Sequence, residues 1–342
     1  MTNINYELKE ALNRVGVYFD EHKYNALTSA VKKSIAMDAQ PALGTSPNSS
    51  IPSFLTNYFD PKVIDFLFSP LRGADVAGQE SIKGDWTQNV ITFNVLEFTG
   101  SVASYDDFSN NGVSKANTNF PSRQPFLYQT NIRWGELEAA RMALTRIDWI
   151  AQQQRSTMNT LNRYQNLTYF FGVDGLVNYG LLNDPALPAA IPPIGGLAWS
   201  DPSADGQKIY NDLLNLATDL ITRSNGIVTS MSKMTLAMSP YASSYIKKTT
   251  TFMAVTAEEL FKQQFPNVRF VVAPELDTVA GQTLRLKADA DDGTLTEEVA
   301  YNLKLRTFPV FPNLSNYMQK YAQGTVGNLL YRPVLVSRMV GI

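Results

Sequence analysis

The sequence predicts an α+β fold, in which a long β-hairpin and a long helix precede a layered α/β region and a last group of strands. Three patterns lead to this prediction. Residues 86–98 are dominated by β-branched and aromatic side chains, residues 136–171 repeat apolar side chains at helical spacing, and residues 209–273 alternate the two patterns. With 342 residues, 44% of them hydrophobic, the chain can build a sizeable core.

The first segment, residues 1–70, is predicted to be an N-terminal arm. Leu8, Leu12 and Val15 lie at helical spacing, but residues 41–52 (PALGTSPNSSIP) have the composition of extended and turn-rich backbone. We therefore expect this arm to extend over a neighbouring molecule and not to form a domain of its own.

A long hairpin is predicted next. The strand at residues 86–98 (WTQNVITFNVLEF) is expected to pair with a second strand at residues 125–134 (PFLYQTNIRW), with the polar residues 101–122 as a loose tip. Two strands alone bury too little apolar surface to be stable in water. We expect the hairpin to pack on another subunit.

Residues 136–171 show the strongest periodicity in the chain. The apolar positions at spacings of three, four or their sums are Leu137, Ala140, Leu144, Ile147, Ala151, Met158, Leu161, Tyr164 and Phe171. No Pro or Gly interrupts them, so we predict one helix about 50 Å long at 1.5 Å per residue. Gly172 and Gly175 are expected to end it.

Residues 185–199 contain four prolines and are predicted to be a linker. The α/β region follows, and its helical face ends at Gly226. Its expected elements are a helix through Ile209, Leu213, Leu216 and Leu220, a strand at 234–238, a helix that Ser239 and Pro240 begin and that runs to about Thr249, a helix with a Thr256–Glu259 capping box, and a strand at 268–273.

The last part of the chain is predicted to form strands at 283–287, 299–307 and 319–340, with a bend at Gly324 and Gly327. The acidic stretch that precedes the second of these contains Asp289, Asp291, Asp292, Glu297 and Glu298. No register places Gly and Glu where a calcium-binding loop needs them, so we interpret the stretch as a solvated turn.

Composition excludes most enzyme chemistry. The chain has no Cys and a single His, His22, so it has no disulfide, no Cys-ligated metal and no two-His metal site. Three S-x-x-K matches, at Ser29, Ser230 and Ser244, are interpreted as chance, and the chain has no Gly-rich phosphate loop. We predict no catalytic residue, no cofactor and no bound metal.

Charge and targeting signals point to a cytoplasmic chain that buries surface against partners. Charged residues make up 18% of the chain, against roughly 25% in ordinary domains, and 29 basic residues balance 31 acidic ones. This balance argues against a dedicated nucleic-acid binder. Residues 1–20 lack a secretory apolar core, and residues 185–199 are broken by proline, so we expect no membrane contact.

Non-specific contact with nucleic acid remains open on the long helix. Its candidate DNA-facing residues are Arg141, Arg146, Arg155 and Arg163. Their spacing does not make one strict stripe, and a solvated helical face is the alternative interpretation.

The order of these elements resembles that of the major capsid proteins of tailed bacteriophages, whose fold encapsulin shells share. Residues 128–140 (YQTNIRWGELEAA) lead from a strand into a spine helix that contains Glu-Leu. Residues 170–185 (FFGVDGLVNYGLLNDP) resemble the G-x-x-x-x-G-L-x-N-x-P type loop that follows this helix in the family. The motifs are degenerate, and the order of parts carries most of the resemblance.

The resemblance implies a division of the chain into family parts. These are an N-terminal arm (1–70), a connector (71–83), an E-loop hairpin (84–134), a peripheral domain with the spine helix (135–188), an α/β axial domain (189–310) and return strands of the peripheral domain (311–342). Many relatives carry a long cleaved scaffolding region, whereas this arm begins about 85 residues before the hairpin. Scaffolding is therefore expected to be a separate protein or absent.

The implied function is self-assembly into hexamers and pentamers of an icosahedral or prolate phage head around double-stranded DNA. Assembly is expected in the cytoplasm of the bacterial host, with the protein ending in the virion. Other expected partners are separate scaffolding, decoration or portal proteins. The residues expected at subunit interfaces are Trp86, Phe93, Tyr105, Asp106, Asp107, Phe108, Lys115, Phe120, Arg123 and Tyr128.

Two alternatives stay open. An encapsulin-type compartment shell has the same fold but encloses enzymes instead of a genome. A cytoplasmic carbohydrate-active enzyme could use scattered carboxylates with the 16 Tyr and 4 Trp as sugar platforms, although dispersed aromatic residues more often belong to cores or interfaces.

Overall fold

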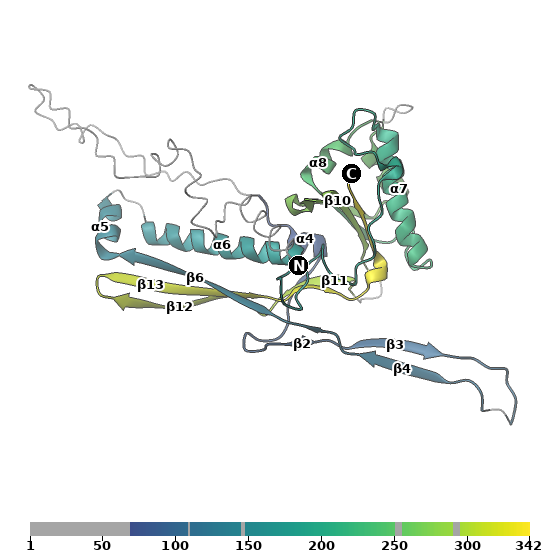
Figure 1. Ribbon diagram of the computed structural model, residues 1–342, viewed down its shortest axis with the longest axis horizontal. Coiled ribbons are helices and arrows are strands. Elements are labelled where there is room, and N and C mark those ends of the chain that lie inside the picture. Colours follow the sequence, from purple (N-terminus) through teal and green to yellow (C-terminus); the bar gives the residue numbers. More distant parts are fainter. Residues whose placement is uncertain (1–68, 109, 145–147, 250–254, 290–294) are drawn as a thin grey trace, which may run out of the picture.

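A computed structural model of the protein describes residues 69–108, 110–144, 148–249, 255–289 and 295–342. The predicted arm at 1–70 lies almost wholly outside these residues, as do His22 and Arg146. Figure 1 shows an elongated layer of helix on sheet, a hairpin that projects beyond it, and an α/β domain at the same end.

In the elongated layer, helix α6 lies along a three-stranded antiparallel sheet in the order β12-β13-β6 (Figure 1). Its elements are α5 (Glu136–Leu144), α6 (Trp149–Phe171), β6 (Phe126–Gly135), β12 (Leu303–Asn313) and β13 (Asn316–Thr325). An apolar cluster of Ile132, Trp134, Leu161 and Tyr321 joins helix and sheet. Burial of these side chains is what fixes the helix on the sheet.

The single helix predicted over 136–171 is wrong, because the structure has two helices. The second begins after Asp148, whose carboxylate accepts a hydrogen bond from the Ala151 backbone N–H at 3.1 Å and so caps a new helix. The first, α5, buries none of its residues, and its Leu137 and Leu144 are exposed. Sequence spacing alone cannot distinguish one long helix from two helices in the same register of apolar residues.

The projecting hairpin consists of β3 (Val95–Gly100) and β4 (Ser114–Asn119), with a short pair of strands, β2 (Ile91–Thr92) and β5 (Ser122–Arg123), at its base. The predicted partner strand at 125–134 is β6 instead, which pairs with β13 from Asn316↔Gly135 to Thr325↔Phe126. That pairing buries Ile132 and Trp134 against α6, whereas pairing with the hairpin would leave them in water. The polar stretch predicted as a loose tip supplies β4.

The α/β domain is built on a sheet in the order β15-β10-β7-β8, with β9 beside β10. Its strands are β7 (Met234–Met238), β8 (Val268–Val272), β9 (Asp277–Thr278), β10 (Gly281–Ala288) and β15 (Val336–Val340), and its helices are α7 (Gly206–Arg223), α8 (Pro240–Tyr245) and α9 (Ala257–Gln264). The Ser239 cap and the Thr256–Glu259 capping box are confirmed, although α8 ends at Tyr245 and not near Thr249. One large apolar cluster unites helices and sheet.

A small sheet in the order β1-β11-β14 lies between the two parts, next to the short helix α4 (Gly73–Ala77). Its strands are β1 (Glu80–Ile82), β11 (Glu297–Tyr301) and β14 (Gly327–Leu330). The strand predicted at 299–307 is therefore divided at Asn302 between two sheets, and the one predicted at 319–340 is divided among three. Of the bend predicted at Gly324 and Gly327, the part at Gly327 is confirmed, since its φ is +83°, whereas Gly324 lies inside β13.

The segment predicted as a linker, residues 185–199, is packed and not free. Trp199 is fully buried, and its indole N–H donates to the Asp212 carboxylate of α7 at 2.8 Å. The same carboxylate accepts from the Ile194 backbone N–H and pairs with Lys208. The remaining short helices are η2 (Ile194–Gly196), η3 (Pro274–Leu276) and η4 (Pro333–Leu335).

In the described parts of the chain, no helix is long and apolar enough to cross a membrane. Nor do these residues contain a group of three or more His, Asp or Glu side chains that could hold a metal ion.

Candidate assembly surface

The β3–β4 hairpin exposes a set of large apolar side chains and has no core of its own. All residues of both strands are exposed. The largest of the exposed side chains on the hairpin and its tip are Phe98 (82%), Val102 (101%), Tyr105 (91%) and Phe108 (99%). Soluble monomers rarely leave such a group uncovered, so this surface has the character of a contact with another chain.

Most of the residues expected at subunit interfaces lie on this exposed surface. Trp86, Tyr105, Asp106, Asp107, Phe108, Lys115 and Phe120 are all exposed. Phe93 is half-buried and packs edge-on against Tyr331, with ring centroids 6.0 Å apart. The Arg306 guanidinium lies 4.4 Å from the centre of the Trp86 ring, which fixes that indole at the root of the hairpin.

Two of the expected interface residues, Tyr128 and Arg123, make contacts within their own chain. The Tyr128 ring lies 4.6 Å from that of Tyr164, and its hydroxyl donates to Gln323 Oε1 at 3.1 Å. Burial raises the pKa of Tyr128. Arg123 forms an ion pair with Asp184 at 3.0 Å, and 12% of its side chain is exposed. Both residues are half-buried by contacts within their own subunit, and their place at a subunit interface stays a prediction.

The arginines expected to face DNA divide in the same way. Arg141 on α5 and Arg155 on α6 are exposed. Arg163 is buried, with 6% of its surface exposed, which contradicts the prediction for this residue. It lies four residues before the buried Leu167, and so on the face of α6 that is buried against the rest of the subunit. Burial lowers the pKa of the Arg163 guanidinium.

The structure of the loop after α6 shows why the motif at residues 170–185 contains Gly and Asn. Gly172, with a φ of +65°, ends the helix. The Asn183 amide donates to the Phe171 carbonyl at 2.5 Å, and its carbonyl accepts from the Gly180 N–H at 2.6 Å. Leu181 is fully buried between them. The motif is therefore a packed connection that fixes the end of the helix against the rest of the chain.

Gly180 leaves no room for a side chain in this loop. A Cβ at this position would lie 2.3 Å from the carbonyl carbon and oxygen of Phe170. We expect Gly180→Ala to force the two backbone segments apart and to lower the free energy of unfolding by about 1–3 kcal/mol, the range for overpacking. Urea denaturation of the unassembled subunit measures this change.

Gly135→Ala is the matched control, because the nearest atom to a Cβ there, Glu138 Cβ, is 3.8 Å away. Its free energy of unfolding is expected to stay close to that of the parent. A Gly180→Ala variant as stable as Gly135→Ala would show that the loop relaxes and that the close approach is not required.

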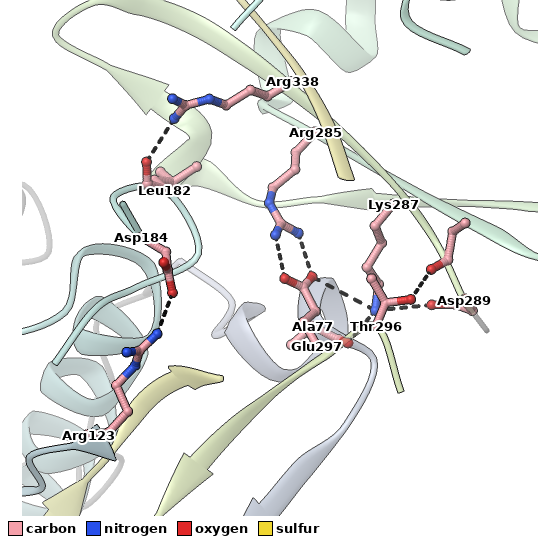
Figure 2. A network of polar contacts seen from close by, with 11 residues as sticks. Ala77, Arg123, Leu182, Asp184, Arg285, Lys287, Asp289, Thr296, Glu297 and Arg338 are labelled. Atoms are coloured by element: carbon pink, nitrogen blue, oxygen red, sulfur yellow. Dashed lines mark hydrogen bonds and ion pairs between the residues drawn. The ribbon is translucent and has the colours of Figure 1, made fainter. Parts of the chain in front are cut away.

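A buried ionic network joins the α/β domain to the small sheet (Figure 2). Arg285 of β10 donates through both terminal nitrogens to the Glu297 carboxylate of β11, and both side chains are almost completely buried. Lys287 donates to the Ala77 carbonyl at the end of α4 and pairs with Asp289 at 3.1 Å. The network ties three separate elements at one point.

This network also corrects the interpretation of the acidic stretch. Glu297 and Glu298 are buried in β11, and not part of a solvated turn, while residues 290–294 lie outside the described residues. Glu298 accepts from the Tyr331 hydroxyl at 2.6 Å and pairs with Lys83 at 2.7 Å. The sequence held one unused signal, since Arg285 and Lys287 are spaced to share one face of a predicted strand.

Comparisons with known proteins agree with this geometry. The profile of a family described as Pa193 gp26 major capsid protein matches residues 42–341. No curated protein sequence matches the chain significantly.

Among solved structures, the fold is similar to three capsids. The capsid of Myoviridae Phage XM1 has a TM-score of 0.69 and 15% identity over 86% of this chain and 100% of that one. The capsid of a native GTA particle has a TM-score of 0.58 and 10% identity over 86% and 98%. The capsid of Cyanophage P-SCSP1u has a TM-score of 0.53 and 10% identity over 89% and 98%. At identities this low, the structural similarity shows that the fold is shared and nothing more.

Proposed function

Because the chain belongs to the Pa193 gp26 major capsid protein family and is a capsid-forming protein, we propose that its copies assemble as hexamers and pentamers into a closed phage head around double-stranded DNA. The observation that carries this proposal is the hairpin, whose large apolar side chains are exposed on a strand pair without a core. A ring of subunits, each covering the hairpin of the next, removes this surface from water.

The parts of the subunit take the places implied by the resemblance. The arm at 1–70 crosses an adjacent subunit, the hairpin lies over a neighbour, and the α/β domain lies near the centre of each ring. The position of β15 supports a change to the expected division, since Val336–Val340 pairs with β10 and so joins the α/β domain instead of the return strands.

Packaged DNA contacts the shell non-specifically, with Arg141 and Arg155 as the exposed candidates. The net charge of −2 supports weak, salt-sensitive contacts and not a dedicated binding site. The family role is structural, and the protein performs it without enzymatic activity. Assembly takes place in the host cytoplasm, and scaffolding, decoration or portal roles fall to separate proteins.

Electron microscopy of the purified protein and of virions tests the proposal. We expect closed particles with five-fold and six-fold rings of this chain, and DNA after extraction of virions. Protein cargo in place of DNA would indicate the encapsulin-type compartment. Small oligomers by light scattering, with the chain absent from virions, would overturn the proposal and favour the carbohydrate-active enzyme.

A further inference from the structure

The hairpin leaves the body of the protein through a short stretch of polar contacts. Immediately after β5, the Gln124 N–H donates to the Val177 carbonyl at 2.9 Å, and its side-chain oxygen accepts from the Val177 N–H at 3.0 Å. The Asn178 side chain donates to the Gln124 carbonyl, also at 3.0 Å. The base of the hairpin is therefore held by the loop that follows α6.

Arg123 adds a charged contact to this base. Its Nη2 lies 3.0 Å from Asp184 Oδ2, and the Asp184 side chain is completely buried (Figure 2). The guanidinium also lies over the Tyr179 ring, 4.9 Å from its centre. The other carboxylate oxygen accepts from the Ala186 N–H at 2.9 Å, so Asp184 is fixed from both sides.

The Arg123–Asp184 ion pair is stronger evidence for a fixed geometry than an ion pair on the surface, because Asp184 is completely buried and Arg123 is nearly so. Water screens it little, and its loss leaves a buried carboxylate without its cation. The cation–π contact with the Tyr179 ring restricts the guanidinium further. Since all residues of β3 and β4 are exposed, the direction of the hairpin depends on contacts at its base, and this pair is the most directional of those described.

We propose that Arg123 is a positioning residue for shell assembly: its ion pair with Asp184 and its cation–π contact with Tyr179 set the direction in which the hairpin leaves the subunit. The angle between a subunit and the neighbour that its hairpin covers follows from this direction. The consequence for assembly rests on the proposed function, whereas the direction of the hairpin is a property of a single subunit.

Distances between two spin labels in the unassembled subunit test the direction. The chain has no Cys, so labels at Lys115→Cys on β4 and Asn159→Cys on α6, both exposed positions, report one distance. We expect one narrow distance peak in the parent and its loss in Arg123→Ala and in Asp184→Asn. Arg133→Ala, which removes an exposed arginine of β6, is the matched control and keeps the narrow peak.

Arg123→Lys, which keeps the charge but removes the planar group, is expected to broaden the peak less than Arg123→Ala. It also carries the test if circular dichroism shows that Arg123→Ala does not fold. A peak in the Arg123 variants that matches the parent in centre and width would overturn the proposal.

Particle diameters then report the effect on assembly. We expect Arg123→Ala to give a mixture of aberrant particle sizes, whereas Arg133→Ala gives the parent diameter. Uniform particles of parent diameter from Arg123→Ala would refute a role in assembly. If the parent itself forms no particles, the proposed function fails, and the label distances still decide whether Arg123 directs the hairpin.

Discussion

Removal of the hairpin is expected to abolish shell assembly and to leave the subunit folded. Residues 96–118 can be replaced by two glycines, because Val95 and Asn119 lie opposite each other in the register of β3 and β4. The deletion removes Phe98, Tyr105 and Phe108, which contact no core. A circular dichroism spectrum that keeps the helical signal of the parent, together with a cooperative melting transition, would report that the remaining residues have kept their fold.

The expected loss in assembly is large. Burial of one large apolar side chain contributes about 1.5–3 kcal/mol, so three such side chains contribute on the order of 5 kcal/mol for each subunit contact. This loss raises the concentration needed for assembly about a thousandfold or more. Light scattering and sedimentation of the variant are expected to show monomers or isolated rings at concentrations where the parent forms particles.

Two variants separate the apolar contact from the length of the hairpin. The triple variant Phe98→Ser, Tyr105→Ser and Phe108→Ser keeps the strands but removes the three large aromatic side chains, and it is expected to fail in assembly as the deletion does. Thr118→Ser changes an exposed polar residue of β4 and is expected to assemble normally. Normal particles from the deletion variant would show that the hairpin is not an assembly contact.

Local signals predicted the elements of the fold much better than their partners. The Thr256–Glu259 capping box and the strand at 234–238 were predictable because their causes lie within a few residues of sequence. The pairing of β6 with β13 joins residues almost 200 positions apart. The sequence pattern instead favoured pairing β6 with the strand predicted at 86–98, which is nearer in the chain. Asp148 went unnoticed as a cap because the apolar spacing continues on both sides of it.

The candidate site was predictable in part, for a related reason. Exposure of Tyr105 and Phe108 follows from a strand pair without a core, which composition and spacing reveal. The inward orientation of Arg123, Tyr128 and Arg163 depends on Asp184, Tyr164 and the packing of α6. No single-sequence pattern places those partners beside them.

Breaking the buried pair of Arg285 and Glu297 is expected to have the largest effect on the stability of the subunit. Glu297→Gln keeps the shape of the side chain but leaves the Arg285 guanidinium, 1% exposed, without its carboxylate. Removal of one partner from a buried pair costs about 3–5 kcal/mol. Urea denaturation in the background without the hairpin, where the subunit stays unassembled, measures this loss free of contributions from shell contacts.

The double variant Arg285→Met with Glu297→Leu separates the pair from the connection it makes. Replacement of a buried pair by apolar side chains is often neutral or stabilising, so we expect the double variant to recover most of the stability that Glu297→Gln loses.

Lys262→Ala removes a partly exposed i,i+4 pair with Glu258 and is expected to change stability by less than about 1 kcal/mol. If Glu297→Gln is no more destabilising than Lys262→Ala, the network does not hold β10 to β11. The double variant is also made in the chain that keeps its hairpin, so that its particles can be measured. If this variant is stable but forms particles of irregular diameter, the charges have a second role in fixing the angle between the α/β domain and the elongated layer. Apolar side chains fill the same space without the directional bonds of the guanidinium fork.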